Sequence, residues 1–249
     1  ELERPIAFSA ERCRDATMET HGIEDVETLV EMEAPSVYSA EASVFVIAAG
    51  AALVERDMAD LLYLSTTDYV QHKHAPSEPE AIAFYAAMDK EIGRLLDAGC
   101  VVGLTADHGM NSKQKADGTP NVIFLEEVLS EQYGDGIKVI LPITDPYVVH
   151  HGALGSFAVT HVSEGTDKDA VHASIKAIEG ITEVYHREEA AERLELPADR
   201  IGDIICLSDQ SVVLGRRREL HDLSAVEQGL RSHGGRHETE IPFLVSAPL

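Results

Sequence analysis

The chain has 249 residues, 44% of them hydrophobic, and a formal net charge of −24 at pH 7. This length supports one hydrophobic core with room for a smaller appended subdomain. The excess of Asp and Glu over Lys and Arg excludes the basic surface that nucleic-acid binding requires. We expect most of the acidic side chains to lie on the solvated surface.

The cysteines and the apolar runs bear on the cellular compartment. Cys13, Cys100 and Cys206 are far apart and show no CxxC spacing, which favours reduced thiols and a cytoplasmic location. The longest apolar stretch, Val44 to Val54, is far shorter than the roughly 20 residues of a membrane-spanning helix. We therefore expect neither a membrane nor a nucleic acid as a partner.

Up to residue 105 the pattern alternates between apolar helices and short apolar strands. We expect a short acidic helix at 24–33, a helix at 39–56 that begins after Ser39, a strand at 61–65, a helix at 79–98 and a strand at 100–105. Ser77 and Glu80 have the spacing of a capping box, and Pro79 stands early in the first turn. Strand, one-sided helix and strand predict a right-handed βαβ unit in a parallel sheet.

After Asn111 the pattern changes to shorter elements. A strand and a short helix are expected within 121–129, followed by strands at 137–142, 156–161, 183–185, 203–207 and 212–214, helices at 167–178 and 188–194, and a last strand at 241–247. The fold class is therefore α/β, a mostly parallel sheet sandwiched by helices with a small α+β cap subdomain. We assign 1–118 and 228–249 to a metal-binding core and 119–227 to the cap.

Two short motifs follow the two predicted strands of the core. Asp68 and His72 come after the first strand, four residues apart, and Asp107 and His108 come directly after the second. Open α/β sheets collect their chemistry at the carboxyl ends of strands. Carboxylate and imidazole ligands suit a divalent transition metal, zinc first.

A third polar segment at 232–238 precedes the last strand. Its glycines allow close approach of the backbone to a ligand, and either His233 or His237 could complete a coordination shell. The pair His150 and His151 is a further candidate, for which we favour a structural role. The segment 152–155 is expected to be a turn, because it lacks the lysine and the glycine spacing of a phosphate-binding loop.

A site rich in carboxylate and imidazole favours hydrolysis at phosphorus. Two metal ions about 4 Å apart suit displacement on a phosphate ester or phosphonate, since one can activate the attacking oxygen while the other shields negative charge. Hydrolysis of an amide by a single ion is the nearest chemical rival.

Four segments together resemble the alkaline phosphatase superfamily, in the branch near the nucleotide pyrophosphatases/phosphodiesterases, and within it the phosphonoacetate hydrolases. The resemblance is carried by 66–73, 105–110, 143–152 and 231–235. It implies an alkaline phosphatase-like fold, two Zn²⁺ ions and hydrolysis of the carbon–phosphorus bond of phosphonoacetate, a small anionic phosphonate, to acetate and phosphate.

The resemblance also implies roles for particular residues. Asp68, His72 and His233 would hold one zinc ion, with His233 preferred to His237 and also a candidate for contacting the substrate. Asp107 and His108 would be ligands of the other ion. The nucleophilic threonine, one aspartate ligand and the lysines that hold the substrate carboxylate are expected upstream of this sequence. We therefore expect the 249-residue chain to be an N-terminally truncated fragment without turnover.

Two other functions stay open at this point. One is a phosphodiesterase or phosphomonoesterase of the same superfamily, and the other is a non-catalytic metal-binding scaffold. A homodimer is left open as the assembly.

Overall fold

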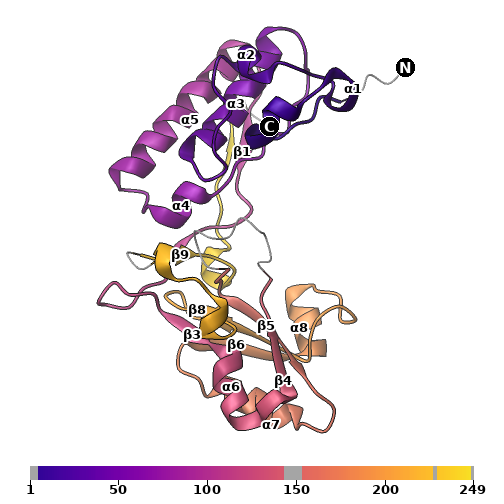
Figure 1. Ribbon diagram of the computed structural model, residues 1–249, viewed down its shortest axis with the longest axis vertical. Helices are drawn as coiled ribbons and strands as arrows, with labels where there is room; N and C mark the ends of the chain where they lie inside the picture. The colour runs from indigo at the N-terminus through magenta and orange to yellow at the C-terminus, as the bar shows by residue number, and fades with distance from the viewer. Residues whose placement is uncertain (1–4, 143–152, 227–228, 248–249) are drawn as a thin grey trace. The chain divides into compact units, whose positions relative to one another are not determined.

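The structure is a computed structural model that describes residues 5–142, 153–226 and 229–247 (Figure 1). The chain divides into two compact units, which we describe separately. Unit 1 comprises 1–105 and 242–249, and unit 2 comprises 106–241. Sequence reasoning placed the division at 118 and 228, whereas the short ladder between β2 (Asn111–Ser112) and β9 (Arg231–Ser232) keeps both flanking segments inside unit 2. The assignment of a metal-binding core and a cap remains a prediction.

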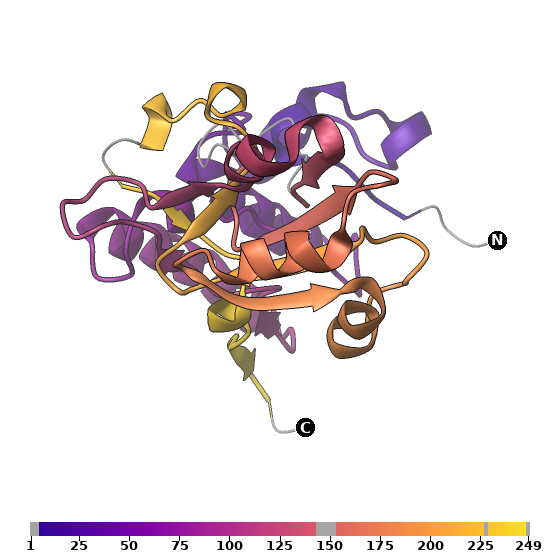
Figure 2. The ribbon, with the colours of Figure 1, turned by 90° about the horizontal axis from the view of Figure 1, so that it is seen from below.

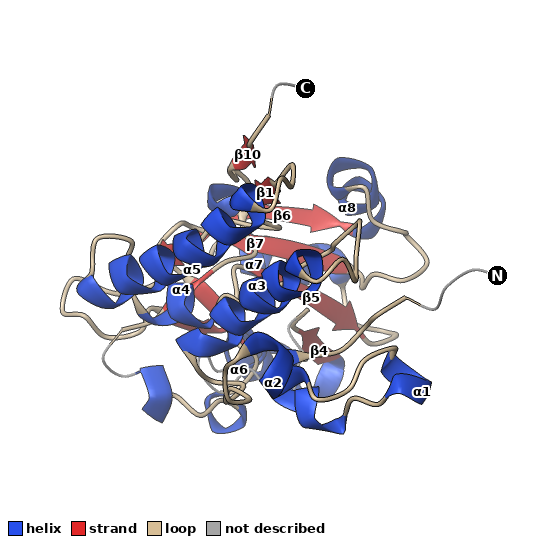
Figure 3. Cartoon of the chain, turned by 90° about the horizontal axis from the view of Figure 1, so that it is seen from above, coloured by secondary structure: helices blue, strands red, loops and turns tan. Residues whose placement is uncertain are grey.

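Unit 1 is mainly helical. Its elements are η1 (Ala10–Asp15), α1 (Met18–His21), α2 (Val26–Val30), α3 (Ala40–Glu55), α4 (Tyr69–Lys73), α5 (Pro79–Asp97), β1 (Gly103–Thr105) and β10 (Phe243–Val245). Figures 1 and 3 show the long helices α3 and α5 packed side by side. Both helices were predicted, α3 from its Ala-rich composition after Ser39 and α5 from its apolar stripe. Gly99 follows α5 with a φ of +89°, as expected after a helix C-terminus. Of the predicted acidic helix at 24–33, only α2 forms.

Two details of unit 1 differ from the sequence predictions. The capping box is wrong, because Glu78 occupies the N-cap of α5 and Ser77 lies outside the helix. Pro79 explains the shift: its ring fixes φ for the first helical position and forces the residue before it to be extended. The strand at 61–65 is also wrong, since this segment is extended but belongs to no ladder among the described residues.

The extended segment 61–65 lies with one side against the helices. Leu62 and Leu64 pack into the apolar clusters around α3, while Leu61 and Tyr63 on the other side are each 92% exposed. β1 pairs with β10 in antiparallel fashion, so the parallel partner predicted for 61–65 is not formed. Unit 1 therefore has one face covered by helices and an opposite face with exposed apolar side chains.

Unit 2 contains a four-stranded antiparallel sheet in the order β4-β5-β7-β6, formed by β4 (Ile137–Ile140), β5 (Phe157–Val162), β6 (Ile181–His186) and β7 (Ile204–Ser208). Figure 2 shows α7 (Lys168–Lys176) lying across one face of this sheet. That face and α6 (Leu125–Tyr133) bury the main core, with Ile204 and Cys206 pointing inward. Ile205 and Leu207 point to the other face, where α8 (Arg187–Leu194) covers them.

The remaining elements of unit 2 are a second, smaller layer. β3 (Val122–Phe124) and β8 (Val213–Gly215) form a parallel ladder. The 3-10 helices among the described residues of this unit are η2 (Gly134–Gly136), η4 (Arg218–Leu220), η5 (Ser224–Val226) and η6 (Arg236–Glu238). The predicted strands and helices of this half are confirmed to within a few residues, but the two-residue strands β2 and β9 were missed. The described helices include none long and apolar enough to cross a membrane.

Candidate metal centre

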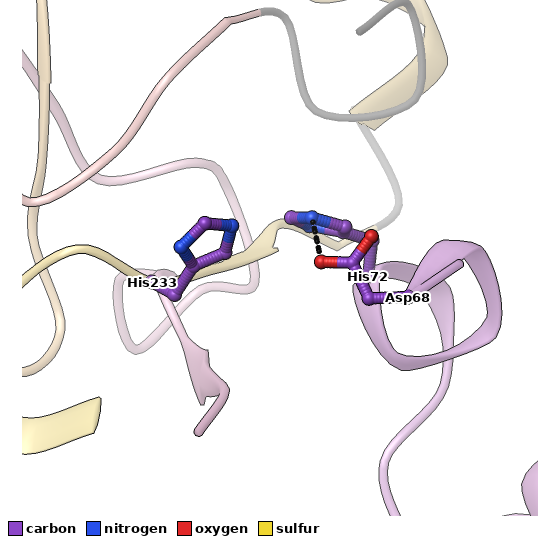
Figure 4. A group of neighbouring side chains, drawn as sticks. All are labelled: Asp68, His72 and His233. Atoms are coloured by element: carbon purple, nitrogen blue, oxygen red, sulfur yellow. Dashed lines mark ion pairs between the residues drawn. The ribbon is translucent and has the colours of Figure 1, made fainter. Parts of the chain in front are cut away.

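Asp68 and His72 lie together on α4 of unit 1. Asp68 is the N-cap residue of this helix, and His72 is one turn later, so both side chains project from the same side. The Nε2 atom of His72 is 3.0 Å from Oδ2 of Asp68, as the dashed line in Figure 4 marks. The His72 side chain is only 1% exposed, whereas that of Asp68 is 38% exposed. The predicted pairing of a carboxylate with an imidazole is therefore present within one helical turn.

Helix α3 fixes the chain just before Asp68. The hydroxyl of Ser43 accepts a hydrogen bond from the Thr67 N–H at 3.1 Å and donates one to the Thr67 carbonyl at 3.2 Å. Leu64 lies so close to α3 that a Cβ on Gly50 would be 2.6 Å from its Cδ1 atom. The glycine thus permits the close contact that sets where α4 begins.

Asp107 and His108 lie at the start of unit 2, directly after β1. Nε2 of His108 is 3.6 Å from Oδ1 of Asp107, whose side chain is 91% exposed. Nδ1 of His108 is 2.9 Å from the carbonyl oxygen of Gly109, which can only accept a hydrogen bond. The proton is therefore on Nδ1, and in the neutral ring Nε2 carries the lone pair that a metal requires.

His233 lies face to face with His108 within unit 2. Their ring centroids are 3.5 Å apart and the rings are inclined by only 10°. The lone pair of an imidazole lies in the plane of its ring, so two nearly parallel planes cannot meet at one ion nearby. Held this way, the two imidazoles suit two separate ions, and the distance of 3.5 Å between their ring centroids is close to the roughly 3.5–4 Å that separates ions in two-metal sites.

The second candidate of the same loop points elsewhere. His237 belongs to η6, its side chain is 42% exposed, and its Nε2 is 3.7 Å from Oδ1 of Asp209. His150 and His151 lie outside the described residues. In unit 2 the structure thus joins His233, rather than His237, to the other predicted ligand His108. Figure 4 also labels His233, which comes from unit 2, whereas Asp68 and His72 come from unit 1.

The donor atoms fit a zinc ion in kind and in spacing. Zinc binds carboxylate oxygen and imidazole nitrogen at about 2.0–2.2 Å, so two ligand atoms of a tetrahedral site are roughly 3.3 Å apart. The separations of 3.0 Å for Asp68 and His72 and 3.6 Å for Asp107 and His108 bracket this value. Each pair therefore accommodates an ion with only small adjustments of the side chains.

Sequence reasoning missed the polar groups packed beside His233. Lys113 and Glu238 form an ion pair of 3.0 Å with side chains 0% and 1% exposed. Burial raises the pKa of Glu238, but hydrogen bonds from Asn111, Lys113 and the Gly235 N–H outweigh it and bring that pKa below its ordinary value. Burial lowers the pKa of Lys113, and the neighbouring carboxylate opposes that change. No sequence motif indicates such a pair, because a lysine in a polar segment is normally solvated.

A second group of possible ligands occurs in unit 1. His74, Glu78 and Glu80 have ligand atoms within 4.8 Å of one another. Their side chains are 32%, 48% and 62% exposed. They surround the N-terminus of α5, where the helix dipole favours anions over cations. We regard this group as a solvated cluster.

Comparison with known proteins places the chain in a family. Residues 13–237 match the family described as type I phosphodiesterase / nucleotide pyrophosphatase. The chain belongs to this family. The match includes every predicted metal ligand, so the resemblance inferred from the four segments is confirmed at the family level.

Solved structures give the fold and a more similar relative. Phosphonoacetate hydrolase from Sinorhizobium meliloti 1021, solved in complex with phosphonoacetate and with phosphonoformate, is 50% identical with a TM-score of 0.89. The match covers 96% of this chain and 58% of that enzyme. Murine ectonucleotide pyrophosphatase / phosphodiesterase 5 is 22% identical over 86% of this chain and 54% of its own, with a TM-score of 0.55, and shows the fold alone. The predicted α/β, alkaline phosphatase-like class is therefore confirmed.

Proposed function

We propose that this chain forms the metal-binding part of a zinc-dependent hydrolase that cleaves the carbon–phosphorus bond of phosphonoacetate. The observation that carries the proposal is the 50% identity, over 96% of the chain, to an enzyme whose structure was solved with phosphonoacetate. The paired carboxylate and imidazole groups of both units support it independently. The proposed products are acetate and phosphate.

The proposed ligand sets follow the ring geometry and the family resemblance. Asp68, His72 and His233 hold one ion. Asp107 and His108 hold the other, in line with the parallel planes of His108 and His233, which suit separate ions. When bound, two zinc ions supply positive charge to the phosphoryl oxygens and lower the pKa of the attacking oxygen. His233 is additionally proposed to contact the substrate.

The chain's own groups orient these ligands before an ion arrives. Nδ1 of His108 donates to the Gly109 carbonyl, so this ring presents Nε2. Burial of His72 keeps water away from its imidazole. Cleavage of the bond leaves a carbanion whose charge moves into the substrate carboxylate. Stabilising that charge in the transition state, more than in the substrate, is what accelerates the reaction.

The ligand sets are tested by the zinc content of the purified chain. Asp68→Ala and His233→Ala are expected to lower the zinc stoichiometry, because each removes a donor that neighbouring groups cannot replace. His237→Ala is the matched control, since it removes the same side chain from the same loop and is expected to keep the wild-type zinc content. Equal zinc in wild type and Asp68→Ala would refute the ligand assignment.

The substrate is tested with the full-length protein and two phosphorus compounds. Phosphate release from phosphonoacetate, without cleavage of a nitrophenyl phosphodiester, is the expected result. Cleavage of the diester alone would replace the proposal by a phosphodiesterase, a function favoured by the family match over 13–237. Zinc binding without hydrolysis of either compound would favour a non-catalytic metal-binding scaffold.

A further inference from the structure

A closed polar network lies directly beside the loop that carries His233. Nζ of Lys113 donates to Oε1 of Glu238 at 3.0 Å and to Oγ of Ser156 at 2.7 Å. Asn111 donates from Nδ2 to the same Glu238 oxygen at 2.7 Å. Ser156 is fully buried, and its hydroxyl in turn donates to the Val212 carbonyl at 3.2 Å. All of these groups belong to unit 2, and the carboxylate is at the centre.

Glu238 contacts the segment of His233 through its side chain. Its Oε2 atom accepts a hydrogen bond from the N–H of Gly235 at 2.9 Å, two residues after His233. The chain passes through Gly234 with a φ of +100°, a conformation that suits glycine. A Cβ on Gly235 would be 2.9 Å from the Cβ of Ser156, so only glycine fits this close contact. The carboxylate thus fixes a tight loop immediately after the imidazole.

Glu238 contacts the segment of His108 through its backbone. Its carbonyl oxygen accepts a hydrogen bond from the N–H of Gly109 at 2.7 Å. The same glycine supplies the carbonyl that receives the Nδ1 proton of His108 at 2.9 Å. One residue therefore connects the backbone beside each of the two stacked imidazoles.

The network also holds His233 from its other side. The His233 carbonyl accepts a hydrogen bond from the Ser156 N–H at 2.9 Å, and the Ser156 side chain is held by Lys113. The desolvation free energy of two buried charges offsets much of their Coulomb attraction. Such a pair therefore often adds little to stability compared with apolar side chains of similar size. A buried pair in contact with both ligand segments is better explained by what it positions.

We propose that Glu238, held in place by Lys113, is a positioning residue that sets the orientation of His108 and His233 toward their metal ions. The inference rests on the proposed function for the identity of the ions. It adds a role for two residues outside the ligand set. Through their contacts, the protein sets the arrangement of the two imidazole rings before metal binds.

The test uses three variants of the chain. Glu238→Gln keeps the shape and removes the charge, and Lys113→Met keeps the stem and removes the ammonium. The double variant Lys113→Met/Glu238→Met replaces the whole pair by apolar side chains and is expected to regain most of the stability that a single change loses. Asp203→Asn is the matched control: its carboxylate is 9% exposed, pairs with Lys168 and Arg187 in unit 2, and contacts neither imidazole segment.

Two readouts are needed. Zinc affinity is measured by competition with a chelating dye, and all three pair variants are expected to lose on the order of 10- to 100-fold, as is typical when a group supporting a metal ligand is removed. The histidine ring resonances of the metal-free protein are expected to shift for His108 and His233 in these variants. Asp203→Asn is expected to lose stability without either effect.

The outcomes separate the two proposals. A wild-type chain that binds no zinc overturns the proposed function, while the ring resonances still decide the positioning role. Unchanged resonances and wild-type zinc affinity in the folded double variant overturn the inference, as does an equal loss of zinc affinity in Asp203→Asn. If the double variant recovers zinc affinity together with stability, Lys113 and Glu238 have a merely structural role. That result also overturns the inference.

Discussion

Ser43→Ala tests whether helix α3 controls the position of Asp68. Ser43 is 2% exposed, and its hydroxyl bonds both the N–H and the carbonyl of Thr67, the residue immediately before Asp68. The substitution removes both hydrogen bonds without adding volume. We therefore expect the segment that leads into α4 to separate from α3 while the helix itself persists.

The size of the effect follows from the contacts. Two neutral hydrogen bonds contribute about 1 kcal/mol each. Alanine returns roughly 0.5 kcal/mol because it is a better helix former than serine. The net loss in the free energy of unfolding is then about 1.5 kcal/mol, and less where water replaces the lost hydrogen bonds of Thr67. Because Asp68 is the next residue, zinc affinity is expected to fall about tenfold as well.

Urea unfolding and a zinc competition titration measure the two effects. Ser39→Ala is the matched control, because the same change at the start of the same helix removes one exposed hydrogen bond, to the Ser36 carbonyl, and no side-chain cap. It is expected to alter stability by less than about 0.5 kcal/mol and to leave zinc affinity unchanged. If Ser43→Ala were no more destabilising than Ser39→Ala, the contact with Thr67 would not be what holds Asp68.

Two further predictions concern one buried and one exposed part of the chain. Burial raises the pKa of Asp203, but Lys168, the Val162 N–H and Arg187 outweigh it and lower that pKa below its ordinary value. Asp203→Asn should therefore lower the free energy of unfolding of unit 2 by about 2 kcal/mol at neutral pH. The difference in unfolding free energy between wild type and variant should shrink below about pH 4, because the wild-type carboxylate is then protonated. A difference that grows in acid would contradict this prediction. Leu61→Ser with Tyr63→Ser removes two side chains that are each 92% exposed. Stability should change by less than about 0.5 kcal/mol while binding of a hydrophobic dye falls, and unchanged dye binding would show that the exposed apolar face lies elsewhere.

The elements that sequence reasoning predicted well are those whose stability is local. Helix α5 carries an apolar stripe, and α3 is Ala-rich and apolar on nearly every side, so composition and spacing within each segment were enough to indicate a helix. A strand needs a partner, and 61–65 has the composition of a strand without a ladder in the described part of the chain. Strands β2 and β9 are the opposite case, because two residues hold no pattern and are defined only by their pairing.

The candidate site shows the same division between local and distant information. Asp68 and His72 are brought together by one turn of helix, so their spacing was sufficient to predict the pair. His233 and His237 could not be separated by spacing, since both precede the same strand. The family resemblance favoured His233, and the structure places His233, not His237, against His108. Lys113 could not be recognised at all, because the sequence gives its charge, whereas its burial depends on contacts with Ser156 and Glu238, which are 43 and 125 positions away.

These observations bear on the entropy cost of binding a metal ion to the candidate ligands of each unit. Side chains that must be ordered on binding reduce affinity, and ligands already held in place avoid that cost. In unit 1, Ser43 fixes the segment before Asp68, and in unit 2, Glu238 connects the segments of His108 and His233. Each unit therefore orders its own ligands through contacts made entirely within itself.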